Sequence, residues 1–148
     1  MQGSNRRKLK LGPLPEYVGY ALRRAQLSTV AQFLGALKDV DLRPTQFAVL
    51  TVIRENPGVR QSEVCTALGI KKANFVPLLN ELQRRGLAVR RAGVSDRRSS
   101  ALHLTADGEG VLERARALHD VYEAGLAGRL GTRGRSQLLS LLGRLIET

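Results

Sequence analysis

Residues 61–86 decide the fold, and they read QSEVCTALGIKKANFVPLLNELQRRG. A short segment with helical periodicity, 61–68, is followed at once by Gly69 and then by a second helical segment that ends at Gly86. Glycine is favoured where a helix ends in a left-handed residue, so the two glycines predict two helix ends. Two helices joined by so tight a turn predict a helix-turn-helix, the unit that places its second helix in the major groove of DNA.

The second of these helices is expected to begin at Lys71 or Lys72 and to carry the DNA contacts. Its polar side chains include asparagine, which suits adenine, and lysine, which suits guanine or phosphate. We predict base contacts from Lys72 and Asn74, phosphate contacts from Lys71 and Arg84, and a further DNA contact from Asn80. The alternative is that these are ordinary solvated positions. The inward face is predicted to consist of Phe75, Leu78, Leu79 and Leu82.

Pro77 lies inside this second helix. Proline removes a backbone donor and clashes with the preceding turn of a helix. We therefore expect either a kink at Pro77 or a helix whose regular part begins only shortly before it.

A short hairpin follows the helix-turn-helix, with strands expected over 87–91 and 99–104. The loop between them is rich in arginine, and an arginine at such a tip can enter the narrow minor groove. Arg97 and Arg98 are therefore predicted to contact DNA, and Asp96 is predicted to pair with an arginine and fix the loop. The alternative is a flexible charged hairpin. A helix-turn-helix followed by this hairpin is a winged helix-turn-helix.

Helical patterns flank this unit on both sides. Thr105 is a plausible cap for a long helix, and Gly125, Gly128 and Gly131 are expected to loosen the chain before a last helix. The terminal helices carry more apolar surface than one small domain can cover, which indicates a dimer interface. The fold class is mainly α with a small β-wing, in one domain. The flanking helices are expected over 15–38, 45–55, 106–126 and 132–147.

Charge is unevenly distributed along the 148 residues, whose net charge is +11. Residues 60–105 hold nine Lys or Arg side chains against three Asp or Glu, whereas residues 106–148 hold six of each kind. A basic middle with a neutral end indicates one surface that faces a polyanion and another that serves a different purpose. The alternative is a generally basic protein with solvated charges.

The sequence lacks the residues that several classes of function require. We find no paired carboxylates, nucleophile elbow or glycine-rich phosphate loop, so the chain is predicted not to be an enzyme. One cysteine and two histidines exclude an internal disulfide and disfavour a metal site of the Cys/His type, and no cofactor is expected. Cys65 is interpreted as a packing residue. The start of the chain is polar and basic rather than apolar, so a cytoplasmic location is expected.

From residue 47 onward the chain resembles the MarR family of bacterial regulators. The resemblance implies a homodimer in which 1–40 and 106–148 form dimerisation helices around a winged helix-turn-helix over 41–105. It also implies binding to a palindromic operator, and repression relieved by a small ligand held between the two regions. One departure is Lys71, since Ser or Thr commonly opens the recognition helix there. The family's wing signature is matched by Asp96, Arg98, Leu104, Thr105 and Gly108.

Residues 12–26 and 72–78 are similar to family members that control aromatic-acid catabolism. Such members respond to hydroxycinnamates, benzoates or their coenzyme A thioesters. Aromatic side chains can stack on an aromatic acid, and arginines can hold a carboxylate or a phosphate. The alternative is that the aromatic residues belong to the core and that the arginines bind DNA or solvent. The candidate ligand residues are Tyr17, Tyr20, Arg23, Arg24, Phe33 and His119.

These observations predict a ligand-responsive dimeric repressor, acting on genes of aromatic-acid catabolism and released by an aromatic acid or its coenzyme A thioester. The alternative is a non-specific or architectural DNA-binding protein without an effector. The two hypotheses differ in sequence discrimination, because specific binders exceed their own non-specific affinity by roughly a thousandfold or more.

Overall fold

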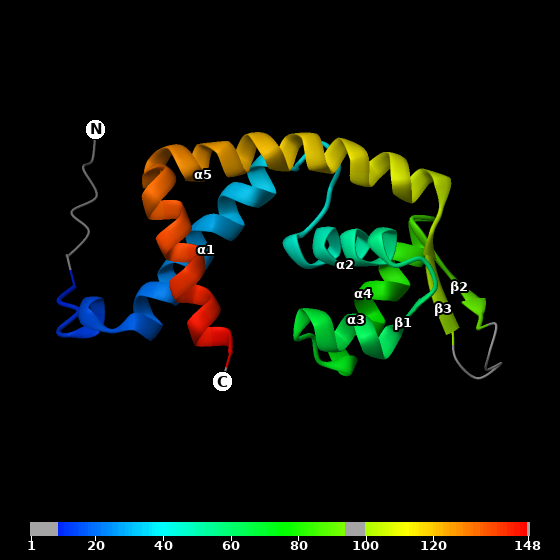
Figure 1. Ribbon diagram of the computed structural model, residues 1–148, viewed down its shortest axis with the longest axis horizontal. Helices are drawn as coiled ribbons and strands as arrows, with labels where there is room; N and C mark the ends of the chain where they lie inside the picture. Colours follow the sequence, from blue (N-terminus) through cyan, green and yellow to red (C-terminus); the bar gives the residue numbers. More distant parts are fainter. Residues whose placement is uncertain (1–8, 94–99, 148) are drawn as a thin grey trace, which may run out of the picture.

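The computed structural model describes residues 9–93 and 100–147. Its elements in chain order are the 3₁₀ helix η1 (Leu14–Glu16), α1 (Val18–Ala36), α2 (Pro44–Glu55), β1 (Val59–Arg60), α3 (Gln61–Leu68), α4 (Lys72–Arg84), β2 (Ala88–Ala92), β3 (Ser100–Leu104) and α5 (Ala106–Ile146). Figure 1 shows α2, α3, α4 and the strands at one end of the molecule. Helix α1 and the distal part of α5 form the other end.

One apolar core holds the helix-turn-helix together. Of the predicted inward face of α4, Phe75, Leu79 and Leu82 are fully buried, whereas Leu78 is half-buried at its edge. Burying a large apolar side chain stabilises a fold by roughly 1.5–3 kcal/mol, so α4 is firmly held by one face and leaves its opposite face to solvent. The core is completed by side chains from the other elements, among them Leu50, Ile53, Val64, Leu102, Leu112 and Ala115.

A three-stranded antiparallel sheet packs beside these helices, in the order β1-β3-β2. The register of β2 on β3 runs from Ala88 opposite Leu104 to Ala92 opposite Ser100, which confirms the predicted hairpin. Strand β1 was not predicted, because two residues are too few to show the alternation that marks a strand. The predicted wing contacts Asp96, Arg97 and Arg98 lie outside the described residues and stay predictions.

The first helix begins later than predicted. Residues Leu14–Glu16 form the separate helix η1, and Tyr17 is extended, with ψ of 127°, before α1 starts at Val18. The prolines at positions 13 and 15 fix the backbone here, so the chain makes one tight turn before the regular helix begins. Helix α1 then ends at Ala36, two residues before its expected end.

Helix α5 is longer than predicted and is interrupted at a single glycine. The Thr105 hydroxyl accepts the N–H of Gly108 at 2.9 Å, which confirms Thr105 as the cap. The expected loosening at Gly125 and Gly128 is wrong, because the helix continues through both. Only Gly131 departs from helical geometry, with φ of +70° and ψ of 160°, values that glycine adopts without steric cost. Figure 1 shows the sharp change of direction in α5 near this point.

The exposed large apolar side chains gather on the terminal helices. Every one of them among the described residues lies between residues 9 and 34 or between residues 121 and 146. They include Val18 and Leu27 on the first side and Leu141, Leu145 and Ile146 on the second. Within residues 9–93 and 100–147, none of the helices combines the length and the apolar character that a membrane span needs.

Gly108 is buried where α5 begins, against the residue that leads into β2. A Cβ at this position would overlap the backbone oxygen of Leu87 and lie 2.9 Å from its carbonyl carbon. That oxygen already accepts the N–H of Thr105 at 3.1 Å. Because the obstacle is backbone rather than a flexible side chain, the junction has no room for a methyl group.

We expect Gly108→Ala to lower the free energy of unfolding by roughly 1–3 kcal/mol or more, since overpacking forces the backbone apart. Gly110→Ala is the matched control, because its Cβ would meet only the Arg114 side chain at 3.8 Å. Alanine's better helix propensity should stabilise that variant by up to about 1 kcal/mol. Urea denaturation at a fixed protein concentration measures both values. A Gly108→Ala variant as stable as Gly110→Ala would contradict this account.

Candidate nucleic-acid interface and an aromatic cavity

The turn between α3 and α4 has the geometry that the sequence predicts. Gly69 takes the left-handed conformation, with φ of 62°, and the N–H of Ile70 donates to the backbone oxygen of Cys65 at 2.9 Å. Lys71 caps the start of α4 with an extended backbone, and its side chain makes no capping hydrogen bond. Lys71 is exposed at the start of α4, so its ammonium can contact a phosphate.

The polar side chains predicted on α4 are exposed, but they do not all share one face. Lys72, Asn74 and Asn80 are exposed to solvent. Asn80 lies roughly opposite the buried Phe75, whereas Asn74 is six residues earlier and therefore turned by about 120°. Asn74 faces the start of α2, where it lines a cleft with Thr45. Helix α4 runs through Pro77 from a start only five residues before it, which matches the second of the two expectations for Pro77.

Arg84 is exposed, with 72% of its side chain accessible, and is paired with Glu81 one turn earlier. Its guanidinium donates to the Glu81 carboxylate at 2.7 and 2.8 Å from Nη2 and at 3.1 Å from Nε. This hydrogen bonding lowers the pKa of Glu81 and raises that of Arg84. The predicted phosphate contact of Arg84 therefore has to form beside a carboxylate that partly neutralises it.

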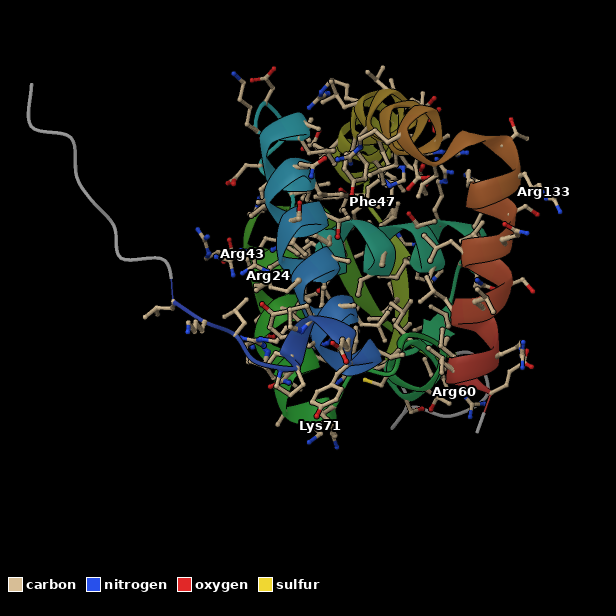
Figure 2. The ribbon with its side chains drawn as sticks, turned by 90° about the vertical axis from the view of Figure 1, so that its left-hand side faces the viewer. Arg24, Arg43, Phe47, Arg60, Lys71 and Arg133 are labelled. Atoms are coloured by element: carbon tan, nitrogen blue, oxygen red, sulfur yellow. The ribbon has the colours of Figure 1, made fainter. Side chains whose placement is uncertain are left out.

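Two arginines that lie just before α2 and α3 flank α4, and they were not predicted as DNA contacts. A cleft of about 550 Å³ separates α4 from the start of α2, where Arg43 and Thr45 are exposed. A second cleft of about 440 Å³, on the α3 side, is lined by Arg60 and Lys72. Figure 2 shows Arg60 and Lys71 at the same end of the molecule. A sequence signal was present, because both arginines immediately precede a helix start, where phosphates are favoured.

Four aromatic rings from three helices meet where the winged unit joins the terminal helices. His119 of α5 stacks on Phe47 of α2, with ring centroids 4.7 Å apart and planes inclined by 23°. Phe33 of α1 meets Phe47, His119 and Tyr122 edge to face, with centroids 5.8–5.9 Å apart. We call these four residues the aromatic cluster. Figure 2 shows Phe47 in the interior, between α1 and α5.

The aromatic cluster lines a cavity of about 240 Å³, which is completed by Thr29, Val30, Pro44 and Glu123. The Tyr122 hydroxyl donates to the backbone oxygen of Thr29 at 3.1 Å, and burial raises the pKa of that hydroxyl. No lysine or arginine is among the described lining residues, and the carboxylate that Glu123 supplies is paired with Arg135 at 3.7 Å. Such walls favour an uncharged aromatic group over a free carboxylate, which they would leave unpaired.

The structure brings together two of the six predicted ligand residues. Phe33 and His119 belong to the aromatic cluster, whereas Tyr17, Arg23 and Arg24 are exposed on or just before the first half of α1 and Tyr20 is half-buried there. Phe47 and Tyr122 were not among the predicted ligand residues. Their sequence neighbourhood shows helical packing alone, and only the long-range approach of α1, α2 and α5 makes them cavity walls.

Two further side chains are of types that bind metals. Cys65 is half-buried and packs against the core, as interpreted. His103 is half-buried in β3. Among the described residues, no three His, Cys, Asp or Glu side chains are grouped closely enough to hold a metal ion.

Comparison with known proteins gives consistent matches. Residues 40–99 match the sequence profile described as the MarR family. A putative transcriptional regulatory protein for the hcr operon of Thauera aromatica is 31% identical over 135 residues, which cover 90% of this chain and 81% of that protein. The transcriptional repressor CouR bound to a 23-mer DNA duplex is 44% identical, with a TM-score of 0.90 over 95% of this chain and 100% of that chain. CouR bound to p-coumaroyl-CoA is 41% identical, with a TM-score of 0.89 over 95% and 99% of the two chains.

We expect Asn74→Ala to relax base preference more than it weakens non-specific binding, because an asparagine amide can read adenine. Loss of one such contact should cost about 1–3 kcal/mol at a single base position. Lys71→Ala is the contrasting variant, which should weaken all duplexes alike and reduce the salt dependence by about one phosphate contact. Selection from a randomised duplex library, followed by anisotropy titrations at several salt concentrations, measures both. Unchanged base preference in Asn74→Ala would remove Asn74 from base recognition.

Proposed function

Because this chain belongs to the MarR family of transcriptional regulators, we propose that it is a dimeric repressor whose palindromic operator is released when an aromatic acyl thioester of coenzyme A binds. The acyl group is proposed to occupy the cavity beside the aromatic cluster. The observation that carries the proposal is the joint placement of this cation-free aromatic cavity and of an exposed recognition helix in one small fold.

On the DNA side, α4 is proposed to enter the major groove with Lys72 and Asn74 near base edges. The first residues of a recognition helix are those that contact bases in helix-turn-helix proteins. Lys71, Arg84 and the asparagine at position 80 are proposed to hold the backbone or an adjoining base. Arg97 and Arg98 are proposed to extend the contact into the minor groove, with Asp96 fixing their loop.

On the dimer side, the exposed apolar residues of α1 and of the distal part of α5 are proposed to pack against a second copy. Leu141 and Leu145 are about half exposed, at 54% and 55%, and Ile146 is exposed at 79%. Contiguous apolar surface of this kind marks an interface in a protein that is otherwise well packed. A symmetric dimer would present two recognition helices, which is the arrangement that a palindromic site requires.

On the effector side, a thioester suits the cavity better than the free acid does. A thioester carbonyl is neutral and needs no cation, whereas a free carboxylate would have to compete with Glu123 for Arg135, which already pairs with Glu123 at 3.7 Å. CouR, whose structure is similar to this chain, was solved with p-coumaroyl-CoA. A volume of about 240 Å³ is too small for the coenzyme, so only the acyl group is proposed to enter the cavity. Arg24 precedes Val30 on α1 by about 9 Å of helix, and we propose that Arg23 and Arg24 meet the phosphates of coenzyme A outside the cavity.

The effector proposal is tested by fluorescence anisotropy on the duplex upstream of the chain's own gene, at near-physiological salt, beside a scrambled duplex. We expect p-coumaroyl-CoA to raise the Kd for the operator by roughly tenfold or more, and p-coumarate or coenzyme A alone to change it little. Release by p-coumarate at equal concentration would instead assign the free acid as effector. Equal affinity for both duplexes would favour an architectural protein.

A cavity-filling variant locates the effector. Val30→Phe places a ring in the cavity and should abolish the change in operator Kd that p-coumaroyl-CoA causes. Ala31→Phe, on the exposed side of the same turn of α1, is the matched control and should respond like the wild type. Full release of Val30→Phe by p-coumaroyl-CoA would place the effector elsewhere.

The dimer proposal is tested with Leu141→Asp combined with Leu145→Asp, one helical turn apart on an exposed apolar face. Charges at an apolar interface should convert the dimer to a monomer and lower operator affinity by about a hundredfold or more, because the second half-site is no longer tethered. Ser140→Asp, exposed in the same segment, should remain dimeric. Light scattering after gel filtration gives the mass. A double variant that stays dimeric would exclude this face as the interface.

A further inference from the structure

Arg85 closes the C-terminal end of α4 and reaches across to another part of the fold. Its guanidinium donates to the backbone oxygen of Asp41 at 2.7 Å and to that of Val40 at 3.2 Å. Both acceptors lie in the turn between α1 and α2. Within residues 9–93 and 100–147, these are the only side-chain hydrogen bonds that join the segment 71–85 to another element.

The hydrogen bonds of Arg85 lie at the edge of an open cleft. The cleft has a volume of about 550 Å³ and is lined on one side by Asp41 and Arg43 and on the other by Asn74 and Glu81. Across that cleft the first turn of α2 and the facing side of α4 are not closely packed. The hydrogen bonds of Arg85 therefore bridge the edge of this cleft, beside the apolar core that holds both the turn and the inner face of α4.

The turn held by Arg85 is connected at both ends to the aromatic cluster. On the α1 side, the N–H of Leu37 donates to the backbone oxygen of Phe33 at 2.9 Å. On the α2 side, the N–H of Phe47 donates to the backbone oxygen of Arg43 at 3.0 Å. A ligand that pushes Phe33 and Phe47 apart must therefore move the turn that lies between them.

The turn is held in one defined conformation, so a displacement would carry it as a unit. Leu37, Val40 and Leu42 are buried, and Asp41 holds a left-handed backbone with φ of +48°, which non-glycine residues rarely adopt. The planar guanidinium matches two carbonyl oxygens at once, in a fork that a lysine ammonium cannot reproduce. Displacement of the turn would thus pull on the end of α4 through Arg85.

We propose that Arg85 is a positioning residue that transmits effector binding at the aromatic cavity to the recognition helix, through its hydrogen bonds to Val40 and Asp41. This inference rests on the proposed function, and it adds the route by which the two sites communicate. Coupling between distant sites requires an element whose arrangement both sites influence, and the turn over residues 37–43 is that element.

The test measures coupling rather than binding alone. In the full-length dimer, we expect p-coumaroyl-CoA to weaken operator binding of the wild type by roughly 5–150-fold, and that of Arg85→Gln by less than about twofold. The affinity of the DNA-free variant for p-coumaroyl-CoA, measured by calorimetry, should stay within about threefold of the wild type, since Arg85 does not line that cavity. Arg114→Gln removes an equal charge from an exposed position on α5 and should retain full release.

Arg85→Lys keeps the charge but loses the fork, and it should lose release as Arg85→Gln does. A purely structural role would lower thermal stability and both affinities together, without changing the ratio of operator Kd values with and without effector. Wild-type release in a folded Arg85→Gln or Arg85→Lys protein would overturn the proposal.

Hydrogen exchange tests the same tie without any effector. Operator binding to the wild type should slow amide exchange over residues 37–43, and Arg85→Gln should lose this protection. Equal protection in both proteins would overturn the role of Arg85. If p-coumaroyl-CoA fails to release even the wild type, the proposed effector is wrong, and this exchange measurement still decides the role of Arg85.

Discussion

The contact among Phe33, Phe47, His119 and Tyr122 is the constraint on which the rest of this structure depends. These rings come from α1, α2 and α5, so they join the winged unit to the helices that carry the exposed apolar surface. Aromatic pairs in these geometries contribute about 0.5–1.5 kcal/mol each beyond the burial of their area. The angle at which they hold α2 against α1 and α5 sets where α4 points relative to the exposed apolar surface of the terminal helices.

The aromatic cluster is also a suitable place for a ligand, because its rings are in contact with one another but leave a cavity beside them. Rings in edge-to-face contact can slide with little loss of contact area, whereas the aliphatic core beneath α4 cannot move without opening voids. The cavity of about 240 Å³ lies beside the aromatic cluster, while Phe75, Leu79 and Leu82 are fully buried in the rigid part. An occupant of the cavity would therefore change the angle between two firm bodies rather than loosen either.

Much of this architecture could be predicted because its signals are local. Gly69 and Gly86 end helices wherever they occur in such a pattern, and the apolar spacing in α4 fixes its buried face without reference to other elements. The family assignment, with a regulator rather than an enzyme, is likewise confirmed. Strand β1 was missed because its pairing with β3 is long-range. The break in α5 was placed too broadly, because glycine permits a kink but only the local backbone at Gly131 realises it.

The candidate ligand site could be predicted only in part, for the same reason. Phe33 and His119 were predicted because aromatic and imidazole rings on the terminal helices can stack on an aromatic acid. Phe47 and Tyr122 were not predicted, because nothing in their local sequence distinguishes them from packing residues. The distribution of charge along the chain nevertheless supports the proposed positions of the dimer interface and the DNA interface. Residues 106–148 hold six basic and six acidic side chains, so two copies can approach there without net repulsion. Residues 60–105, with nine basic against three acidic, would repel a second copy but attract a polyanion. Charge therefore supports the proposed dimer contact over residues 106–148 and the proposed DNA contact over residues 60–105, with the aromatic cluster between them.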